Sequence, residues 1–258
     1  MKPNFNHITD INEREFVKGL FDMAERADRQ NRPFFTDFYK IEFLKDVVTK
    51  YLRKDLSYTY FGGYSEAERQ MLCISPYEGI TESEFDLKLL RITVNTGPSV
   101  MPGHRDFLGS IMGLGINRQL FGDIIVTDYG ADIIVQNQIA EYIMLELKSI
   151  GRYKKINTEV LDIADIVPPT INLKEIRGNV SSLRMDSVLS VMFGISRSEA
   201  TKLINKGLAT CNDRIVKASD EIEENNIIVL RGYGKARFIE ASGRTKKDRI
   251  NIVVQKYV

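Results

Sequence analysis

Cationic and hydroxyl side chains gather near the starts of two expected helices between residues 184 and 206. Arg184 and Arg197 each fall in the first turn of a helix, where the macrodipole disfavours a cation by about 0.3–1 kcal/mol. The free N–H groups of a helix start bind phosphate, and an arginine there adds charged donors for the same anion. The pattern therefore predicts a strip that binds a phosphate backbone, although each residue alone could be an ordinary solvated charge. The strip is expected to comprise Arg184, Ser196, Arg197, Ser198, Lys202 and Lys206.

The apolar pattern around this strip predicts two short helices. Residues 184–193 carry apolar side chains at three-to-four spacing, and Gly194 follows as a natural helix end. The second helix begins at Ser196, which forms an S-x-x-E capping box with Glu199, and it ends at Gly207. Strands follow, so the segment from residue 181 is a helix–helix–hairpin unit.

The basic character continues to the C-terminal end. After a turn at Asn212-Asp213 and a strand over residues 227–230, a basic hairpin tail is predicted over residues 233–258. Residues 181–258 hold 14 basic and 9 acidic side chains, a net of +5, whereas the rest of the chain holds 22 and 26, a net of −4. This asymmetry favours a polyanionic partner, although uneven charge also occurs on ordinary surfaces. Further candidate phosphate contacts are Lys235, Arg237, Arg244, Lys246 and Lys247.

One run of residues in this unit is similar to a known domain. The string R-x-D-x-x-L, then S-R-S, K-x-L-I-x-x-G and N-D-R-x-V, resembles the S4-type RNA-binding domain. The resemblance implies that Arg184, Ser196, Arg197 and Lys202 face RNA. It implies structural roles for Asp186 and Gly207. No paired exposed aromatic residues indicate a base-stacking platform, so we expect recognition of folded RNA by shape and backbone.

The remaining chain predicts an α+β protein with further parts. Residues 1–68 are expected to be mainly helical, with helices over 13–29 and 41–53. Residues 69–165 contain strands and helices in the rough order ββαββαβ, which predicts a ferredoxin-like α/β plait with an added strand near residues 71–76. Pro168-Pro169 indicates a linker over residues 166–180, ahead of the S4-type unit at 181–258.

A second resemblance covers most of the chain. The segment GHRDFLGSIMGLGINRQLFGDI, residues 103–124, lies ahead of a C-terminal S4-type unit and resembles the YlmH family. That resemblance implies a ribosome-associated protein that meets ribosomal RNA and tRNA on the large subunit. Kinship to the S4-type domain of a ribosome-associated heat shock protein suggests the rescue of stalled nascent chains. The family's cell-division gene neighbourhood suggests an alternative, a protein-interaction adaptor at the division site.

The residues of that segment allow two interpretations. His104, Arg105 and Arg118 could form a second RNA surface. Equally, the apolar residues between them fit an ordinary core helix, and Gly122-Asp123 fits a turn into the next strand. We favour the structural interpretation without excluding the other. The expected core positions of the helix are Phe107, Leu108, Ile111 and Met112.

No enzyme or cofactor motif was found. The glycine-rich residues 97–115 match neither the phosphate loop nor the dinucleotide fingerprint. The two histidines and the two cysteines, Cys73 and Cys211, are not spaced as metal ligands. We therefore expect a non-catalytic protein without cofactor or metal. The lack of a long apolar run or secretory signal predicts a cytoplasmic protein, and the oligomeric state stays open.

Overall fold

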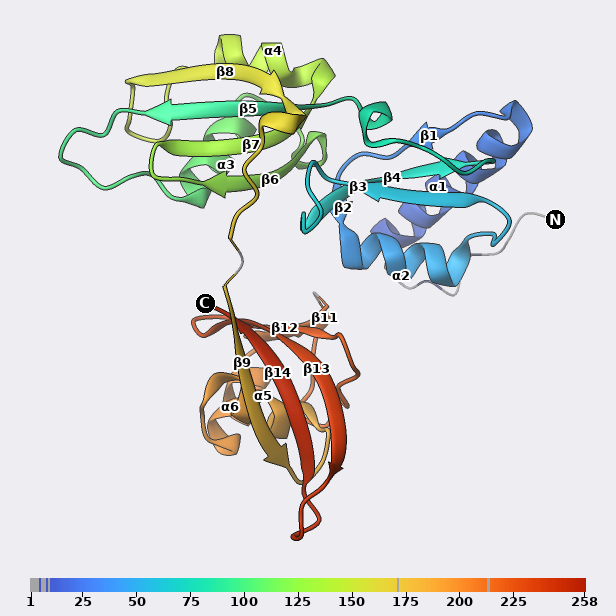
Figure 1. Cartoon of the computed structure of the whole chain (residues 1–258), viewed down its shortest axis with the longest axis vertical. Coiled ribbons are helices and arrows are strands. Elements are labelled where there is room, and N and C mark those ends of the chain that lie inside the picture. Colours follow the sequence, from blue (N-terminus) through green and yellow to red (C-terminus); the bar gives the residue numbers. More distant parts are fainter. Residues whose placement is uncertain (1–4, 6–7, 9, 171, 213) are drawn as a thin grey trace. The chain divides into compact units, whose positions relative to one another are not determined.

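The computed structural model describes the chain except for residues 1–4, 6–7, 9, 171 and 213 (Figure 1). The chain divides into two compact units, Met1–Pro169 and Thr170–Val258. Within the described part of the chain, no helix combines the length and apolarity that crossing a membrane requires.

The first unit begins with two helices packed on a small sheet. Asp10 caps the first helix by accepting a hydrogen bond from Glu13 N at 2.9 Å, and the helix ends where Asn31 adopts a left-handed conformation. Both helices bury apolar side chains against the sheet. Residues 1–68 were expected to be mainly helical, but short strands also lie in this region, so it is only partly helical. The elements are α1 (Ile11–Gln30), β1 (Phe34–Phe35), β2 (Tyr39–Lys40), α2 (Ile41–Tyr51), β3 (Ser57–Phe61) and β4 (Arg69–Ser75).

Strand β4 corrects one sequence prediction. We expected the strand near residues 71–76 to be the added strand of the plait, but β4 pairs with β1, β2 and β3 in the N-terminal sheet. Nearly every residue of β4 is buried. An apolar run identifies a buried strand, but it does not identify the strand's partners.

The rest of the first unit is a four-stranded antiparallel sheet in the order β6-β7-β5-β8, with α3 and α4 on one face (Figure 1). This βαββαβ order is the ferredoxin-like plait. Its elements are β5 (Leu87–Val94), α3 (His104–Met112), β6 (Phe121–Val126), β7 (Gly130–Gln136), α4 (Asn137–Glu146) and β8 (Ile156–Asp162), with 3-10 turns at Glu82–Phe85, Arg118–Leu120 and Ile163–Asp165.

The sheet face opposite α3 and α4 packs against the N-terminal elements. Phe38, Phe61 and Phe85 form one apolar cluster with side chains of the plait strands, among them Ile125 and Ile134. Gly122 allows the close approach, because a Cβ atom there would lie 2.8 Å from the Phe38 ring. One packed interior therefore joins the two halves of this unit.

The second unit is a six-stranded sheet in the order β11-β10-β12-β13-β14-β9, with α5 and α6 buried against one face (Figure 1). Gly178 packs against Val191 of α5, since a Cβ atom would lie 2.5 Å from Val191 Cγ1. The elements are β9 (Leu173–Val180), α5 (Met185–Phe193), α6 (Arg197–Asn205), β10 (Ala209–Cys211), β11 (Arg214–Ile215), β12 (Ile227–Leu230), β13 (Gly234–Arg244) and β14 (Ile250–Tyr257).

Strand β9 corrects the linker prediction. Residues 173–180 are not part of a linker, because all eight pair with β14, the last strand of the chain. The predicted turn at Asn212-Asp213 is only partly described. Asn212 adopts the left-handed conformation of such a turn, and Asp213 lies outside the described residues.

Candidate RNA interface

Two arginines at the starts of α5 and α6 share one buried carboxylate. Arg197 Nη2 lies 3.2 and 3.1 Å from the two carboxylate oxygens of Asp186, and Arg184 donates to the same oxygens at 3.3 and 3.2 Å. The Asp186 side chain is only 7% exposed, whereas Arg184 and Arg197 are 39% and 50% exposed. The carboxylate therefore fixes both guanidinium groups while leaving part of each accessible.

This arrangement gives the two arginines a role in the fold that the sequence did not predict. Burial alone would raise the pKa of Asp186, but hydrogen bonds and charge from Arg184 and Arg197 hold it below its usual range. The carboxylate also offsets the unfavourable macrodipole at both helix starts. A structural role and a phosphate-binding role are compatible, because the outer edges of the guanidinium groups stay exposed.

The remaining residues of the strip follow α6. Ser196 caps the helix by accepting from Glu199 N at 3.1 Å, and its hydroxyl lies 3.0 Å from that of Ser198. Ser198, Lys202 and Lys206 are exposed at four-residue spacing, so they share one side of the helix. The structure thus brings the predicted strip together along α6.

The basic hairpin tail does not continue this strip. In β13, Ala236 and Phe238 face the helices in the buried core, so the alternating Lys235 and Arg237 lie on the opposite face of the sheet. Lys235 also lies over the Tyr257 ring, with Nζ 4.8 Å from the centroid. These two residues form a separate surface, contrary to the expected extension.

Three further candidates lie at the end of the β13–β14 hairpin, which projects from the unit (Figure 1). Lys246 and Lys247 are exposed in the turn. Arg244 forms an ion pair with Asp248 at 2.8 Å, and both side chains are mostly exposed. Such an exposed pair stabilises weakly, so Arg244 can exchange this partner for a phosphate.

The proposed second RNA surface in the plait is divided by the structure. Arg105 is exposed on α3. Arg118 points inward, donating to the carbonyls of Phe121 and Gly122 at 2.5 and 3.0 Å, and burial lowers its pKa to about 10. Partial desolvation and the charge of Arg118 lower the pKa of His104. Arg118 therefore serves the fold, whereas Arg105 and His104 are exposed on α3.

The neighbouring Asp123 has a role that the sequence did not reveal. It lies in β6 and is not part of a turn. Its carboxylate accepts from Tyr64 Oη at 2.8 Å, Glu68 N at 2.7 Å and Arg69 N at 3.1 Å, all in the N-terminal half of the unit. Burial raises the pKa of Asp123. Residues 118–123 at the end of the segment therefore join the plait to the N-terminal elements. In α3 itself Phe107 and Ile111 are fully buried as expected, but Met112 is 46% exposed.

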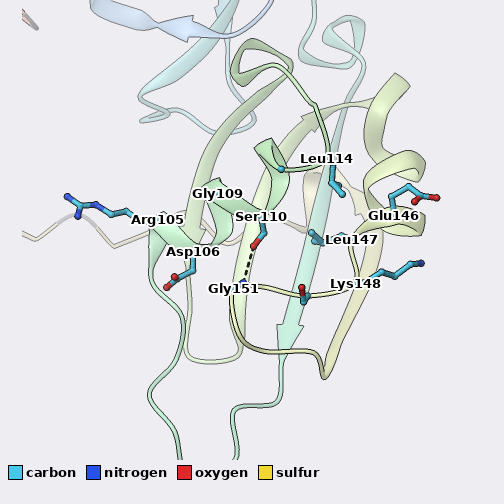
Figure 2. A pocket seen from close by; sticks show the side chains of 11 residues that line it. Arg105, Asp106, Gly109, Ser110, Leu114, Glu146, Leu147, Lys148 and Gly151 are labelled. Atoms are coloured by element: carbon cyan, nitrogen blue, oxygen red, sulfur yellow. Dashed lines mark hydrogen bonds between the residues drawn. The ribbon is translucent and has the colours of Figure 1, made fainter.

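Sequence reasoning also missed a basic loop beside α3. Residues 148–155 contain four exposed cations and no acidic residue, a local signal that the sequence analysis did not use. With α3 this loop lines an open cleft of about 590 Å³ (Figure 2). The cations are Lys148, Arg152, Lys154 and Lys155.

No group of histidine, cysteine or acidic side chains among the described residues is arranged to hold a metal ion. Cys73 is buried and Cys211 is half-buried, and neither forms a disulfide. Burial raises the pKa of Cys73 to about 12 and that of Cys211 to about 11, which suppresses thiolate reactivity.

Comparison with known proteins gives separate matches for the N-terminal elements, the plait and the second unit. Residues 12–78 match the family model described as "YlmH, N-terminal", residues 81–165 match "Putative RNA-binding domain in YlmH", and residues 183–228 match the S4 domain. The chain is 29% identical over 248 residues to the Bacillus subtilis (strain 168) ribosome-associated protein quality control protein P2, covering 95% of each. A solved structure, cell division protein ylmH from Streptococcus pneumoniae, superposes with a TM-score of 0.53 at 22% identity, covering 65% of this chain and 99% of that one.

Proposed function

Because the chain belongs to the YlmH family of RNA-binding proteins, we propose that it docks on folded ribosomal RNA and on tRNA bound to the large ribosomal subunit. The S4 domain and the RNA-binding domain of the plait make it an RNA-binding protein. The Bacillus subtilis relative is named for ribosome-associated quality control. That name supports the finer proposal that this chain acts in the rescue of stalled nascent chains.

The observation that carries the proposal is the shared carboxylate of Asp186. It holds Arg184 and Arg197 at the starts of two adjacent helices, with both guanidinium groups part-exposed. A planar guanidinium that is already oriented loses less conformational entropy when it binds a phosphate. Lys202 and Lys206 continue the positive charge along α6, as expected for a surface that follows a nucleic-acid backbone.

We further propose that the protein is a binder without catalytic activity. The best-placed polar groups of the first unit already have structural partners: Asp123 holds three donors from the N-terminal half, and Asp106 accepts from Gly103 N at 2.8 Å. Neither cysteine thiol is activated, since burial raises both pKa values. The functional side chains that remain are cations suited to phosphate contacts.

Crosslinking followed by sequencing of the bound RNA tests the proposed partner. The full-length chain is expressed in a bacterial host, crosslinked in living cells and purified under denaturing conditions. We expect discrete positions in large-subunit ribosomal RNA and in tRNA. Recovery of no RNA above the level of an untagged control would overturn the proposal.

A protein-interaction adaptor at the division site is the second candidate function. It is favoured by the name of the Streptococcus pneumoniae structure. The same crosslinked material separates the two candidates, because an adaptor yields crosslinked proteins in place of RNA. Co-sedimentation of the chain with purified large subunits provides an independent check.

A further inference from the structure

The open sheet face of a plait is a frequent site for RNA, but here that face is poorly suited to RNA. The N-terminal elements cover part of it through the apolar cluster of Phe38, Phe61 and Phe85. Beyond that cluster, Arg91 is engaged by buried Asp132, with donor–acceptor distances of 2.9 and 2.8 Å. The nearby Glu159 adds an exposed negative charge. An RNA contact of the plait is therefore better sought elsewhere.

The cleft between α3 and the basic loop is better suited to RNA than the sheet face. The basic loop is defined as residues 148–155. This loop lies beside residues 95–105: Asn95 N donates to Lys155 O at 2.9 Å, and Tyr153 Oη donates to Val100 O at 2.5 Å. Neither segment contains an acidic residue. Together they place Arg105 and the four cations of the basic loop on one end of the plait.

The backbone of the basic loop is held in a defined shape. Ile150 and Tyr153 exchange two backbone hydrogen bonds of 2.9 Å, which close a tight turn with Gly151 and Arg152 at its tip. Gly151 has a φ of +53°, which favours glycine. Its N–H donates to Ser110 Oγ of α3 at 3.1 Å, as Figure 2 shows. The turn is thereby tethered to the helix, so its cations are presented from an ordered backbone.

The floor of the cleft is formed by small residues of α3. Gly109 and Ser110 of α3 and Gly113 just after it present small side chains to the cleft, which Leu114 and Leu147 also line. Figure 2 places Arg105 and Lys148 at opposite ends of the cleft. Two acidic residues also line it: Asp106, whose carboxylate accepts from Gly103 N, and Glu146 beside Lys148. Arg105 and Lys148 balance these two charges within the cleft. Arg152, Lys154 and Lys155 do not line it, but they add three exposed positive charges in the same loop.

We propose that the basic loop and the cleft beside it bind the phosphodiester backbone of folded RNA and are the RNA contact of the plait. The proposal rests on the proposed RNA-binding function and adds a second, separate contact to that of the S4 domain. Arg152 stacks on Tyr153, with its guanidinium carbon 5.1 Å from the ring centroid, so its charge is held at the tip of the turn. Phosphate contacts position a protein on RNA without reading sequence, so the cleft should bind many folded RNAs similarly.

The test compares two charge-reversal variants of the full-length chain. Arg152→Glu combined with Lys155→Glu alters the basic loop. Lys45→Glu combined with Lys54→Glu makes the same change in net charge at exposed positions of the N-terminal half. Binding to bulk tRNA and to a purely double-stranded RNA hairpin is measured across salt concentrations. Unfolding midpoints are recorded for each variant, so a folding defect is recognised.

The proposal predicts that the loop variant loses about tenfold in affinity for both RNAs and that its salt slope falls by about two phosphate contacts. The control should stay near the wild type. If the loop variant and the control bind RNA with equal affinity while the wild type binds tightly, the basic loop is not an RNA contact. That outcome would leave the proposed function intact. Absence of RNA binding by the wild type itself would contradict the proposed function. Crosslinking of peptides from residues 148–155 to the hairpin provides a second readout that does not depend on the substitutions.

Discussion

Arg197 at the start of α6 contacts both carboxylate oxygens of Asp186 in α5, at 3.2 and 3.1 Å. The contact joins two helices whose first turns would otherwise hold unmatched positive charge. Met185 N and Asp186 N donate to Asp220 O and Ala218 O at 2.7 and 3.3 Å, so the start of α5 is also fixed by the loop that precedes β12. Asp186 is therefore the residue on which the geometry of the predicted phosphate strip depends.

Replacing Asp186 with asparagine should lower the stability of the second unit. The substitution removes a buried charge acceptor shared by two arginines, which costs about 1–3 kcal/mol, at the lower end because both arginines are part-exposed and can be solvated. Urea denaturation of the full chain measures the loss. An unchanged midpoint would show that the shared carboxylate does not stabilise the unit.

The stabilities of the wild type and of Asp186→Asn should also differ in their dependence on pH. The pKa of Asp186 is lower in the folded state than in the unfolded chain, so the stabilisation is present above the unfolded value of about 3.9 and is lost as pH falls through the folded value. The stability gap between wild type and Asp186→Asn should be constant near neutral pH and should narrow below about pH 4. A gap of the same size at pH 3 would contradict the assignment.

Removing the carboxylate of Asp123 should loosen the contact between the plait and the N-terminal sheet. Asp123→Ala leaves Tyr64 Oη, Glu68 N and Arg69 N without their acceptor, at an expected cost of about 2–4 kcal/mol. Tyr64→Phe, which removes one of the three donors, should cost about 1 kcal/mol. Thermal unfolding of both variants gives the comparison. Equal losses of stability in Tyr64→Phe and Asp123→Ala would contradict the role of Asp123 as a shared acceptor.

Gly122 and Gly19 should respond in opposite directions to alanine. A Cβ at Gly122 would lie 2.8 Å from the Phe38 ring, whereas nothing lies within 4 Å of a Cβ at Gly19 in α1. Gly122→Ala should therefore destabilise by about 1–3 kcal/mol through overpacking. Gly19→Ala should stabilise by up to about 1 kcal/mol through helix propensity. Calorimetric unfolding temperatures check both signs, and stabilisation by Gly122→Ala would refute the close packing.

Local signals in the sequence predicted much of the fold. Helix α3 was predicted from its apolar stripe, and it begins and ends beside the glycines that flank that stripe, Gly103 and Gly113. The two helices of the second unit and the strand β12 were also predicted from their patterns. The partners of β4 and the existence of β9 were missed. Strand β9 is mostly polar and exposed and follows two prolines, and its pairing partner β14 is the last strand of the chain. Pairings that distant leave no local pattern.

The candidate site was predictable in composition but not in arrangement. The cations of α6 were found because they cluster in sequence. The contact between Arg197 and Asp186 was not predicted, because Arg197 lies eleven residues away and the contact depends on the crossing of two helices. Arg118 shows the converse: a cation in a suggestive motif turned inward to backbone carbonyls. Burial and hydrogen bonding of a charged residue are decided by tertiary packing.

The contact between Arg197 and Asp186 makes Arg197 a poor residue for testing RNA binding. Arg197→Glu would weaken RNA binding, but it would also place a second negative charge beside buried Asp186 and disturb the fold. Lys202 and Lys206 are exposed on α6 and spaced to share one side, so their reversal separates binding from folding. Lys45→Glu with Lys54→Glu is the matched control, as above.

The most direct test is the salt dependence of binding to purified large ribosomal subunits by the wild type, Lys202→Glu with Lys206→Glu, and the control. The account predicts that the α6 variant binds about tenfold or more weakly at low salt, with a flatter salt slope by about two contacts, while its unfolding midpoint and the control are unchanged. Binding by the α6 variant that matches the wild type at every salt concentration would contradict the account.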